Sequence, residues 1–273
     1  MIAYLRLFRA DAALIAFFSY LTGAELVGGA RLQDVIAAAL VTCISTNFIY
    51  SFNSWADRRI DAVNKPWRPI PAGQVAPEKA LRYSLFLLVL AVVYPFFIAR
   101  TSLTLFLFEL LPALGLLYSA RPFCFRRHPA FSTPTISLGL ITPLMLGCFM
   151  NGADHRLWTV FVALFLYCIS VVPLKDIEDA EGDRAFGIRN LHLAWGDRLP
   201  LISLAGLTLD LVWIGAAPMR EALMIVVATV VAATMACIGI FRYLRLKPEK
   251  LYKAVIRAAI VLAAMAGIFF RWG

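Results

Sequence analysis

The side chains best suited to chemistry are carboxylates in two short segments of the sequence. The first segment contains Asn53, Asp57 and Asp61, at spacing i, i+4 and i+8. This spacing places all three on one helical face, provided that the apolar stretch before them continues as a helix through the motif. We therefore predict a polar face at the end of that stretch.

The second segment contains Asp176, Asp179 and Asp183, at spacing i, i+3 and i+7. These three also share one helical face, whereas Glu178 and Glu181 point away from it. The two segments together hold seven of the 17 acidic residues and lie 119 positions apart, from 57 to 176. A single DxxxD pattern is common in ordinary loops, so the pairing of two such rows carries the functional interpretation.

Two facing carboxylate rows repel each other unless cations lie between them. Oxygen ligands without His or Cys favour Mg²⁺, which takes few protein ligands and completes its shell from phosphate oxygens and water. The expected partner is therefore a diphosphate that Mg²⁺ bridges to both rows. Among the flanking bases, Arg68 is the strongest phosphate-binding candidate because a guanidinium can form two parallel hydrogen bonds. The other flanking bases are Lys65, Lys175 and Arg184.

The composition indicates that membrane-spanning helices position these residues. The 273-residue chain is 61% hydrophobic and 16% charged, whereas soluble domains are about half apolar and about a quarter charged. We expect an all-α polytopic membrane protein, built as one transmembrane domain over residues 1–273 with motif loops at about 53–78 and 175–197. The nine predicted spans are 11–29, 34–54, 80–99, 101–119, 133–150, 157–174, 199–217, 221–241 and 253–270.

The basic residues indicate the topology. With a cytoplasmic N-terminus, the 26 Lys and Arg residues divide 21 to 5 in favour of the cytoplasmic side. This distribution follows the positive-inside rule and predicts nine helices with the C-terminus on the opposite side. Both acidic segments then leave the cytoplasmic ends of helices four apart, which suggests two pseudo-repeated four-helix halves plus one helix. The net charge of +9 is explained by this topology, so no nucleic-acid partner is expected.

Both acidic segments resemble motifs of the UbiA superfamily of intramembrane prenyltransferases. The run NSWADRRIDAVNKPWRPIPAG is similar to the family pattern NxxxDxxxD followed by NxPxRPIxxG. The run KDIEDAEGDRAFGIRNL is similar to the second pattern, DxxDxxxD with a trailing Gly and Leu. The wording KDIEDAEGD looks closest to the branches that make archaeal-type ether lipids, tocopherol-type quinones and chlorophyll.

The resemblance implies nine helices around a central cavity that cytoplasmic loops cap. It also implies Mg²⁺-dependent transfer of a prenyl group from an isoprenyl diphosphate to a lipophilic acceptor, an aromatic ring or a hydroxyl, with two Mg²⁺ ions. Carried over by position, the residues that hold the metals and diphosphate would be Asn53, Asp57, Asp61, Asp176, Asp179 and Asp183, with Arg68 on the phosphates.

This chain departs from the family pattern at the phosphate clamp. The third cytoplasmic loop of many members has Tyr-x-x-x-Lys; here Tyr118 is present but Pro122 replaces the Lys. We expect Arg121 or Arg126 to take that role. Two smaller departures are Ser54, where many members have Asp, and Asn190, where many have Thr.

Ionisation of a prenyl diphosphate leaves an allylic cation, which aromatic faces stabilise by about 0.5–2 kcal/mol each. The candidates near the cytoplasmic rim are Phe52, Trp55, Tyr118 and Phe123, although packing or the membrane interface explains each equally well. Polar residues inside the predicted spans are functional candidates by default, or else hydrogen bonds between helices. These are Asn47, Glu109 and Asp210. No His is an evident base, since His128, His155 and His192 lie in loops.

Two alternative functions remain. A terpene cyclase of the same superfamily needs the same metal site and differs only in lacking an acceptor. A membrane transporter or lipid-binding protein would favour inverted repeats and ionisable residues at the midplane. The clustering of acids at one face and the unchanged orientation across four helices argue against the transporter.

Overall fold

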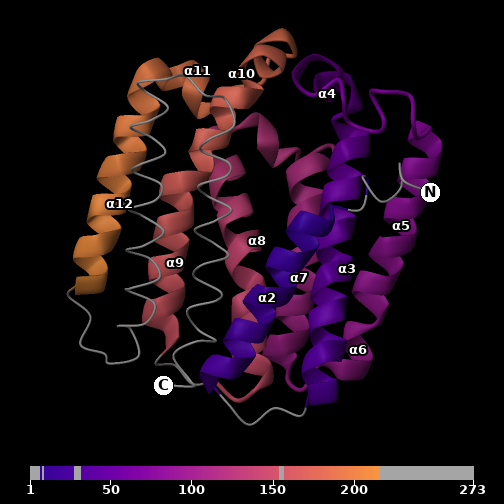
Figure 1. The fold of residues 1–273 in the computed structure, drawn as a ribbon, viewed down its shortest axis with the longest axis vertical. Helices are drawn as coiled ribbons and strands as arrows, with labels where there is room; N and C mark the ends of the chain where they lie inside the picture. The colour runs from indigo at the N-terminus through magenta and orange to yellow at the C-terminus, as the bar shows by residue number, and fades with distance from the viewer. Residues whose placement is uncertain (1–6, 8, 28–31, 154–156, 216–273) are drawn as a thin grey trace. The chain divides into compact units, whose positions relative to one another are not determined.

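The computed structural model describes residues 7, 9–27, 32–153 and 157–215. Every regular element in these ranges is helical (Figure 1), as the composition predicts. Within them, six helical segments are long and apolar enough to cross a membrane. They are Ala10–Val27, Leu32–Ala56, Pro77–Ile98, Ser102–Ser119, Pro129–Met150 and Val160–Ala185.

These segments coincide with the first six predicted spans. The seventh, 199–217, corresponds to α12 (Leu199–Gly215). The last two, 221–241 and 253–270, lie outside the described residues. The count of nine helices and the repeat of two halves therefore stay predictions.

The described residues of Met1–Gly152 and Asp179–Asn190 form one compact unit. Its four long inner helices contact one another in a closed cycle: α2 contacts α3, α3 contacts α7, α7 contacts α8, and α8 contacts α2. A fifth helix, α5, packs on α3. The bounds are α2 Ala10–Val27, α3 Leu32–Ala56, α5 Pro77–Val93, α6 Pro95–Ile98, α7 Ser102–Ser119 and α8 Pro129–Met150.

Two glycines allow α2 and α8 to touch backbone to backbone. A Cβ on Gly23 would collide with the backbone of Leu144 and Cys148, and a Cβ on Gly147 would collide with the backbone of α2. Small residues are common at helix crossings in membranes because close approach maximises van der Waals contact where no hydrophobic force acts between helices. This crossing fixes α8 against α2.

At the end of the unit away from the acidic motifs, Arg100 links three segments. Its Nη2 donates to Asp34 Oδ2 at the start of α3, at 2.9 Å, and its Nη1 donates to the Met150 carbonyl at the end of α8, also at 2.9 Å. Asp34 and Arg100 are both largely exposed, so the pair adds little stability by itself. It does supply a reference ion pair remote from the acidic motifs.

The acidic motifs lie on short elements that continue long helices. The first motif runs from α3 into α4 (Arg58–Asn64), and a 3₁₀ turn, η1 (Phe125–Arg127), precedes α8. The second motif forms α10 (Asp176–Ala185), which follows α9 (Trp158–Val171) through the 3₁₀ turn η3 (Val172–Lys175). The predicted helical faces are thus both realised.

The described residues of Ala153–Glu178 and Leu191–Gly273 form the second unit. Within it, α9 packs along α12, and a short helix, α11 (Leu191–Trp195), and a 3₁₀ turn, η4 (Gly196–Arg198), lead into α12. The helix α10 crosses the division, so Asp176 belongs to this second unit while Asp179 and Asp183 belong to the first. Organisation as a single domain stays a prediction.

Candidate active site

The first motif is helical throughout, with a small break at Asp57. The backbone N–H of Asp57 donates to the Asn53 carbonyl, and that of Asp61 donates to the Asp57 carbonyl, both at 2.8 Å. Asp57 is 7% exposed and Asp61 is 4% exposed. The Asn53 amide contacts the Asp57 carboxylate at 2.5 Å and Ser119 Oγ, on the end of α7, at 3.2 Å. The predicted polar face therefore points inward.

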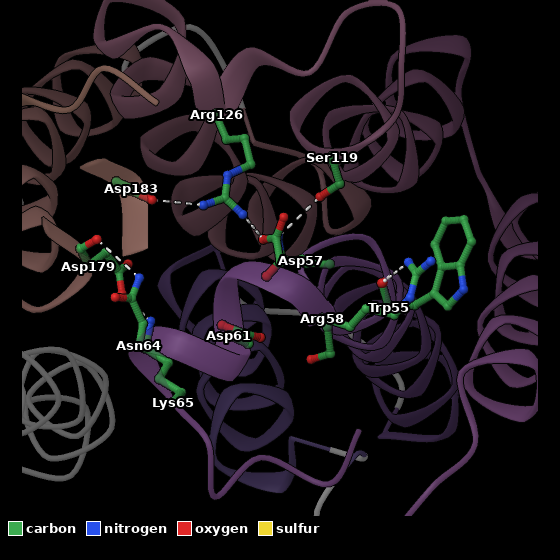
Figure 2. A network of polar contacts seen from close by, with 12 residues as sticks. Trp55, Asp57, Arg58, Asp61, Asn64, Lys65, Ser119, Arg126, Asp179 and Asp183 are labelled. Carbon is green, nitrogen blue, oxygen red and sulfur yellow. Dashed lines mark hydrogen bonds and ion pairs between the residues drawn. The ribbon is translucent and has the colours of Figure 1, made fainter. Parts of the chain in front are cut away.

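A guanidinium joins the first motif to the second. Arg126, on η1, forms an ion pair through Nη1 with Asp57 and donates through Nη2 to Asp183 Oδ1 at 3.2 Å. Figure 2 shows the side chain between the two aspartates. Arg121 is exposed on the turn before η1. Of the two arginines predicted as substitutes for the family Lys, Arg126 therefore meets the aspartates.

Burial and charge act in opposite directions on this pair. Burial raises the pKa of the Asp57 carboxyl, the Arg126 guanidinium opposes that rise, and the Asp61 carboxylate adds to it. Burial alone would lower the pKa of Arg126, but Asp57, Tyr118 and Asp183 raise it above the ordinary value. Arg126 therefore stays charged, and Asp57 gains stability from any further cation placed beside it.

The other two aspartates of the first unit are paired in the same way. Arg68 Nη1 contacts Asp61 Oδ2 at 2.5 Å, and Lys65 forms an ion pair with Asp179. Lys65 and Arg68 therefore both face the acidic rows, as predicted. Four carboxylates and three basic side chains make up this network, which leaves a net charge of −1.

Asp183 is held through both oxygens. Arg126 contacts Oδ1, and Asn190 donates from Nδ2 to Oδ2 at 2.9 Å. Asp183 and Asn190 are each 4% exposed. In the sequence, Asn190 was only a departure from the family pattern; its amide provides the donor that this buried carboxylate needs.

In the second unit, Asp176 is also bound through both oxygens. Lys175 Nζ contacts Oδ1 at 2.6 Å, and the backbone N–H of Leu191 donates to Oδ2 at 2.9 Å. Asp176 is 4% exposed, whereas Glu181 on the same helix α10 is exposed. The prediction that Glu181 lies off the carboxylate face agrees with this arrangement.

Of the four aromatic candidates, Tyr118 lies nearest the charged network, since it interacts electrostatically with Arg126. Phe52 is buried and stacks on Phe48. Arg58 lies over the Trp55 ring at 5.3 Å from its centroid. These contacts account for Phe52 and Trp55 as packing residues, and the fourth candidate, Phe123, is 61% exposed.

The polar residues within the helices are partly satisfied. Asn47 donates from Nδ2 to the Cys43 carbonyl at 2.9 Å. Its Oδ1, one carboxylate oxygen of Glu109 and both of Asp210 have no hydrogen-bond partner among the described residues. Nothing in the described structure assigns them a role. Of the histidines, His128 is exposed, His192 is half-buried on α11, and His155 lies outside the described residues.

The donor set can be tested against Mg²⁺. Among the described residues, no three Asp, Glu, His or Cys side chains gather closely enough to form a metal cage. The acidic rows instead offer single carboxylate oxygens separated by basic side chains. This arrangement fits Mg²⁺, which is usually held by one or two carboxylates plus substrate phosphates and water.

One side chain of the first motif was not singled out from the sequence. Asn64, the last residue of α4, hydrogen-bonds to the backbone of α10 at Asp179 and Gly182. The residue stands in the quoted motif, but its spacing from Asp61 carries no sign of such a contact. Ser119, which meets Asn53, also had no signal in the sequence.

Comparison with known proteins gives three findings. The model of the UbiA prenyltransferase family matches residues 13–269. A digeranylgeranylglyceryl phosphate synthase from Methanopyrus kandleri is 35% identical over 211 residues, which cover 74% of this chain and 72% of that protein. One from Methanothrix thermoacetophila is 32% identical over 210 residues, which cover 75% of each.

Solved structures share the fold. A UbiA homolog from Archaeoglobus fulgidus, bound to GPP and Mg²⁺, superposes with a TM-score of 0.78 over 97% of this chain and 99% of that one. The identity between the two is 20%.

Proposed function

Because this chain belongs to the UbiA prenyltransferase family, we propose that it moves a prenyl group from an isoprenyl diphosphate to a lipophilic acceptor inside the membrane. Diphosphate is the leaving group, and Mg²⁺ is the required ion. The observation that carries this proposal is the guanidinium of Arg126 between Asp57 and Asp183, which links the two acidic motifs.

Charge supports a metal-bound diphosphate at this network. Its four carboxylates and three bases carry a net −1, and a diphosphate monoester adds roughly −3. Two Mg²⁺ ions would bring the total to zero, whereas the diphosphate without metal would add to an existing excess of negative charge. The A. fulgidus homolog binds GPP together with Mg²⁺, which agrees with this requirement.

Each side chain has a distinct role in the proposal. Asp57, Asp61 and Asp179 hold the metal ions, with Asp183 and Asp176 completing the two rows. Arg126, Arg68, Lys65 and Lys175 turn from the carboxylates to the diphosphate oxygens when the donor binds. Bound Mg²⁺ supplies the positive charge that makes diphosphate a good leaving group. Tyr118, beside Arg126, faces the allylic cation, and Asn53 orients Asp57.

The acceptor is proposed from the relatives. Those from M. kandleri and M. thermoacetophila are named for the product digeranylgeranylglyceryl phosphate. That product carries two geranylgeranyl groups, so it can form from geranylgeranyl diphosphate and a glyceryl phosphate that already bears one. We take this hydroxyl lipid as the first acceptor to test and an aromatic ring as the second.

The protein is an integral membrane protein, and we propose the full topology predicted from the sequence. It has nine helices in one domain over residues 1–273, with the N-terminus and both motif loops cytoplasmic. The six described spans support the helical part of this proposal, and the charge distribution supports the orientation.

The test uses the full chain in nanodiscs with Mg²⁺, geranylgeranyl diphosphate, and either geranylgeranylglyceryl phosphate or no acceptor. We expect diphosphate release and a product whose mass equals acceptor plus one geranylgeranyl group. A cyclic hydrocarbon formed without acceptor would point to a cyclase, and no diphosphate release from any prenyl donor would refute the proposal.

A matched pair of variants connects the activity to the site. Asp57→Asn should abolish transfer. Asp34→Asn removes the carboxylate of the remote ion pair with Arg100 on the same helix α3 and should leave transfer unchanged.

A further inference from the structure

The first motif touches the second through a side-chain amide as well as through charges. Asn64 Nδ2 donates to the carbonyl oxygen of Asp179 at 3.0 Å, and Asn64 Oδ1 accepts from the backbone N–H of Gly182 at 2.6 Å. Figure 2 shows Asn64 facing Asp179 at the edge of the charged network. One amide thus spans a carbonyl and an N–H on α10, more than a hundred residues along the chain.

Gly182 provides the space for this contact. A Cβ built on Gly182 would lie 2.6 Å from Cγ, Nδ2 and Oδ1 of Asn64. No side chain fits there while the amide is in place. A glycine inside a helix costs about 1 kcal/mol relative to alanine, so the close approach gives a physical reason for its presence in α10.

Only a short amide satisfies both partners. The contact needs one donor and one acceptor on the same planar group, which the Asn side chain provides. An Asp at position 64 would keep the acceptor for Gly182 but place a second oxygen against the Asp179 carbonyl. It would also add a negative charge beside the Lys65–Asp179 ion pair.

The position of the amide matters for the site. Asn64 follows Asp61 by three residues on α4 and precedes Lys65, and Gly182 directly precedes Asp183. We propose that Asn64 is a positioning residue that fixes α4 to α10 and so sets the spacing between Asp61 and Asp183. This inference rests on the proposed function, because that spacing matters only if a metal-bound diphosphate is shared by both rows.

The test measures binding separately from turnover. Calorimetry of the full-length protein with inorganic pyrophosphate and Mg²⁺ gives the affinity of the shared site, and the transfer assay gives kcat and KM. Loss of two neutral hydrogen bonds predicts that Asn64→Ala weakens Mg²⁺–pyrophosphate binding about ten- to one-hundredfold. The melting temperature without ligand should stay within a few degrees of wild type.

A double-mutant cycle separates this role from general damage. Gly182→Ala alone should weaken binding at least as much as Asn64→Ala, because the new methyl meets the amide. Asn64→Ala combined with Gly182→Ala removes the atoms that the methyl would strike. The double variant should therefore bind no worse than Gly182→Ala alone, a clear departure from additivity.

Two control variants carry the same changes elsewhere. Gly139→Ala places a methyl in α8 where the nearest atom, Leu114 Cδ1, is 4.0 Å away, and Asn151→Asp alters an amide that bonds within its own turn to Gly147. Both should bind pyrophosphate normally. Wild-type affinity in Asn64→Ala, or additive losses in the double variant, would overturn the inference. A wild-type protein that binds Mg²⁺–pyrophosphate but transfers no prenyl group would refute the proposed function alone, and the binding cycle would still decide the role of Asn64.

Discussion

Replacing Arg126 separates its chemical role from its structural role. Its side chain is 11% exposed, and its two Nη groups contact carboxylates on different motifs. In Arg126→Lys, one ammonium keeps the charge but cannot bridge both carboxylates in the same fork geometry. The loss of one charge-assisted hydrogen bond costs about 1.5–3 kcal/mol. We expect kcat/KM for the prenyl donor to fall roughly ten- to 150-fold.

Arg126→Ala should also affect folding. It leaves the buried carboxylates of Asp57 and Asp183 without their shared counter-ion, which costs about 3–5 kcal/mol when one partner of a buried pair is removed. The double variant Arg126→Ala with Asp57→Asn removes one of those charges, so it should regain part of the stability but none of the activity. Thermal melting in detergent, followed with the transfer assay, distinguishes the two effects.

The neighbouring arginine supplies the control. Arg127 follows Arg126 on η1 and is exposed, so Arg127→Ala should keep wild-type kcat/KM and melting temperature. The reasoning fails if Arg126→Lys retains full kcat/KM, or if Arg127→Ala loses as much as Arg126→Ala.

Four further predictions concern the metal, the second motif, the helix crossing and the topology. EDTA should abolish transfer in the nanodisc assay, and added Mg²⁺ should restore it; activity that persists in EDTA would exclude the metal site. Asn190→Ala leaves one oxygen of buried Asp183 without its donor, which costs about 1–3 kcal/mol and should lower kcat/KM at least severalfold, whereas a change confined to the melting temperature would make Asn190 purely structural. Gly147→Val drives a side chain into the α2 backbone and should lower the melting temperature or prevent folding, while Gly139→Ala should not. Reporter fusions should place the N-terminus in the cytoplasm and the C-terminus on the other side, and two termini on one side would contradict nine helices.

The acidic faces could be predicted from the sequence because spacing along a helix fixes direction around its axis. Asp57 and Asp61 follow α3 in continued helical register, and Asp179 and Asp183 share α10, as their spacing indicates. The six described spans were predictable for a similar reason, since bilayer thickness sets the length of an apolar helix.

Pairings between helices could not be predicted in this way. The sequence left Arg121 and Arg126 as equal candidates, because either is close to the expected clamp position. The turn at η1 decides between them by exposing Arg121 and directing Arg126 toward Asp57 and Asp183. The contact of Asn64 with Gly182 likewise depends on how α4 meets α10, and no local pattern encodes that approach.

The backbone contact between α2 and α8 also restricts how a lipid could reach the interior. Elsewhere in the bundle, side chains fill the space between helices and can change rotamer to let a chain pass. At Gly23 and Gly147 no side chain separates the two backbones, so an isoprenoid tail could enter there only by prying the helices apart. Lateral entry from the bilayer must therefore use a different pair of helices, and α2 with α8 forms a closed part of the wall.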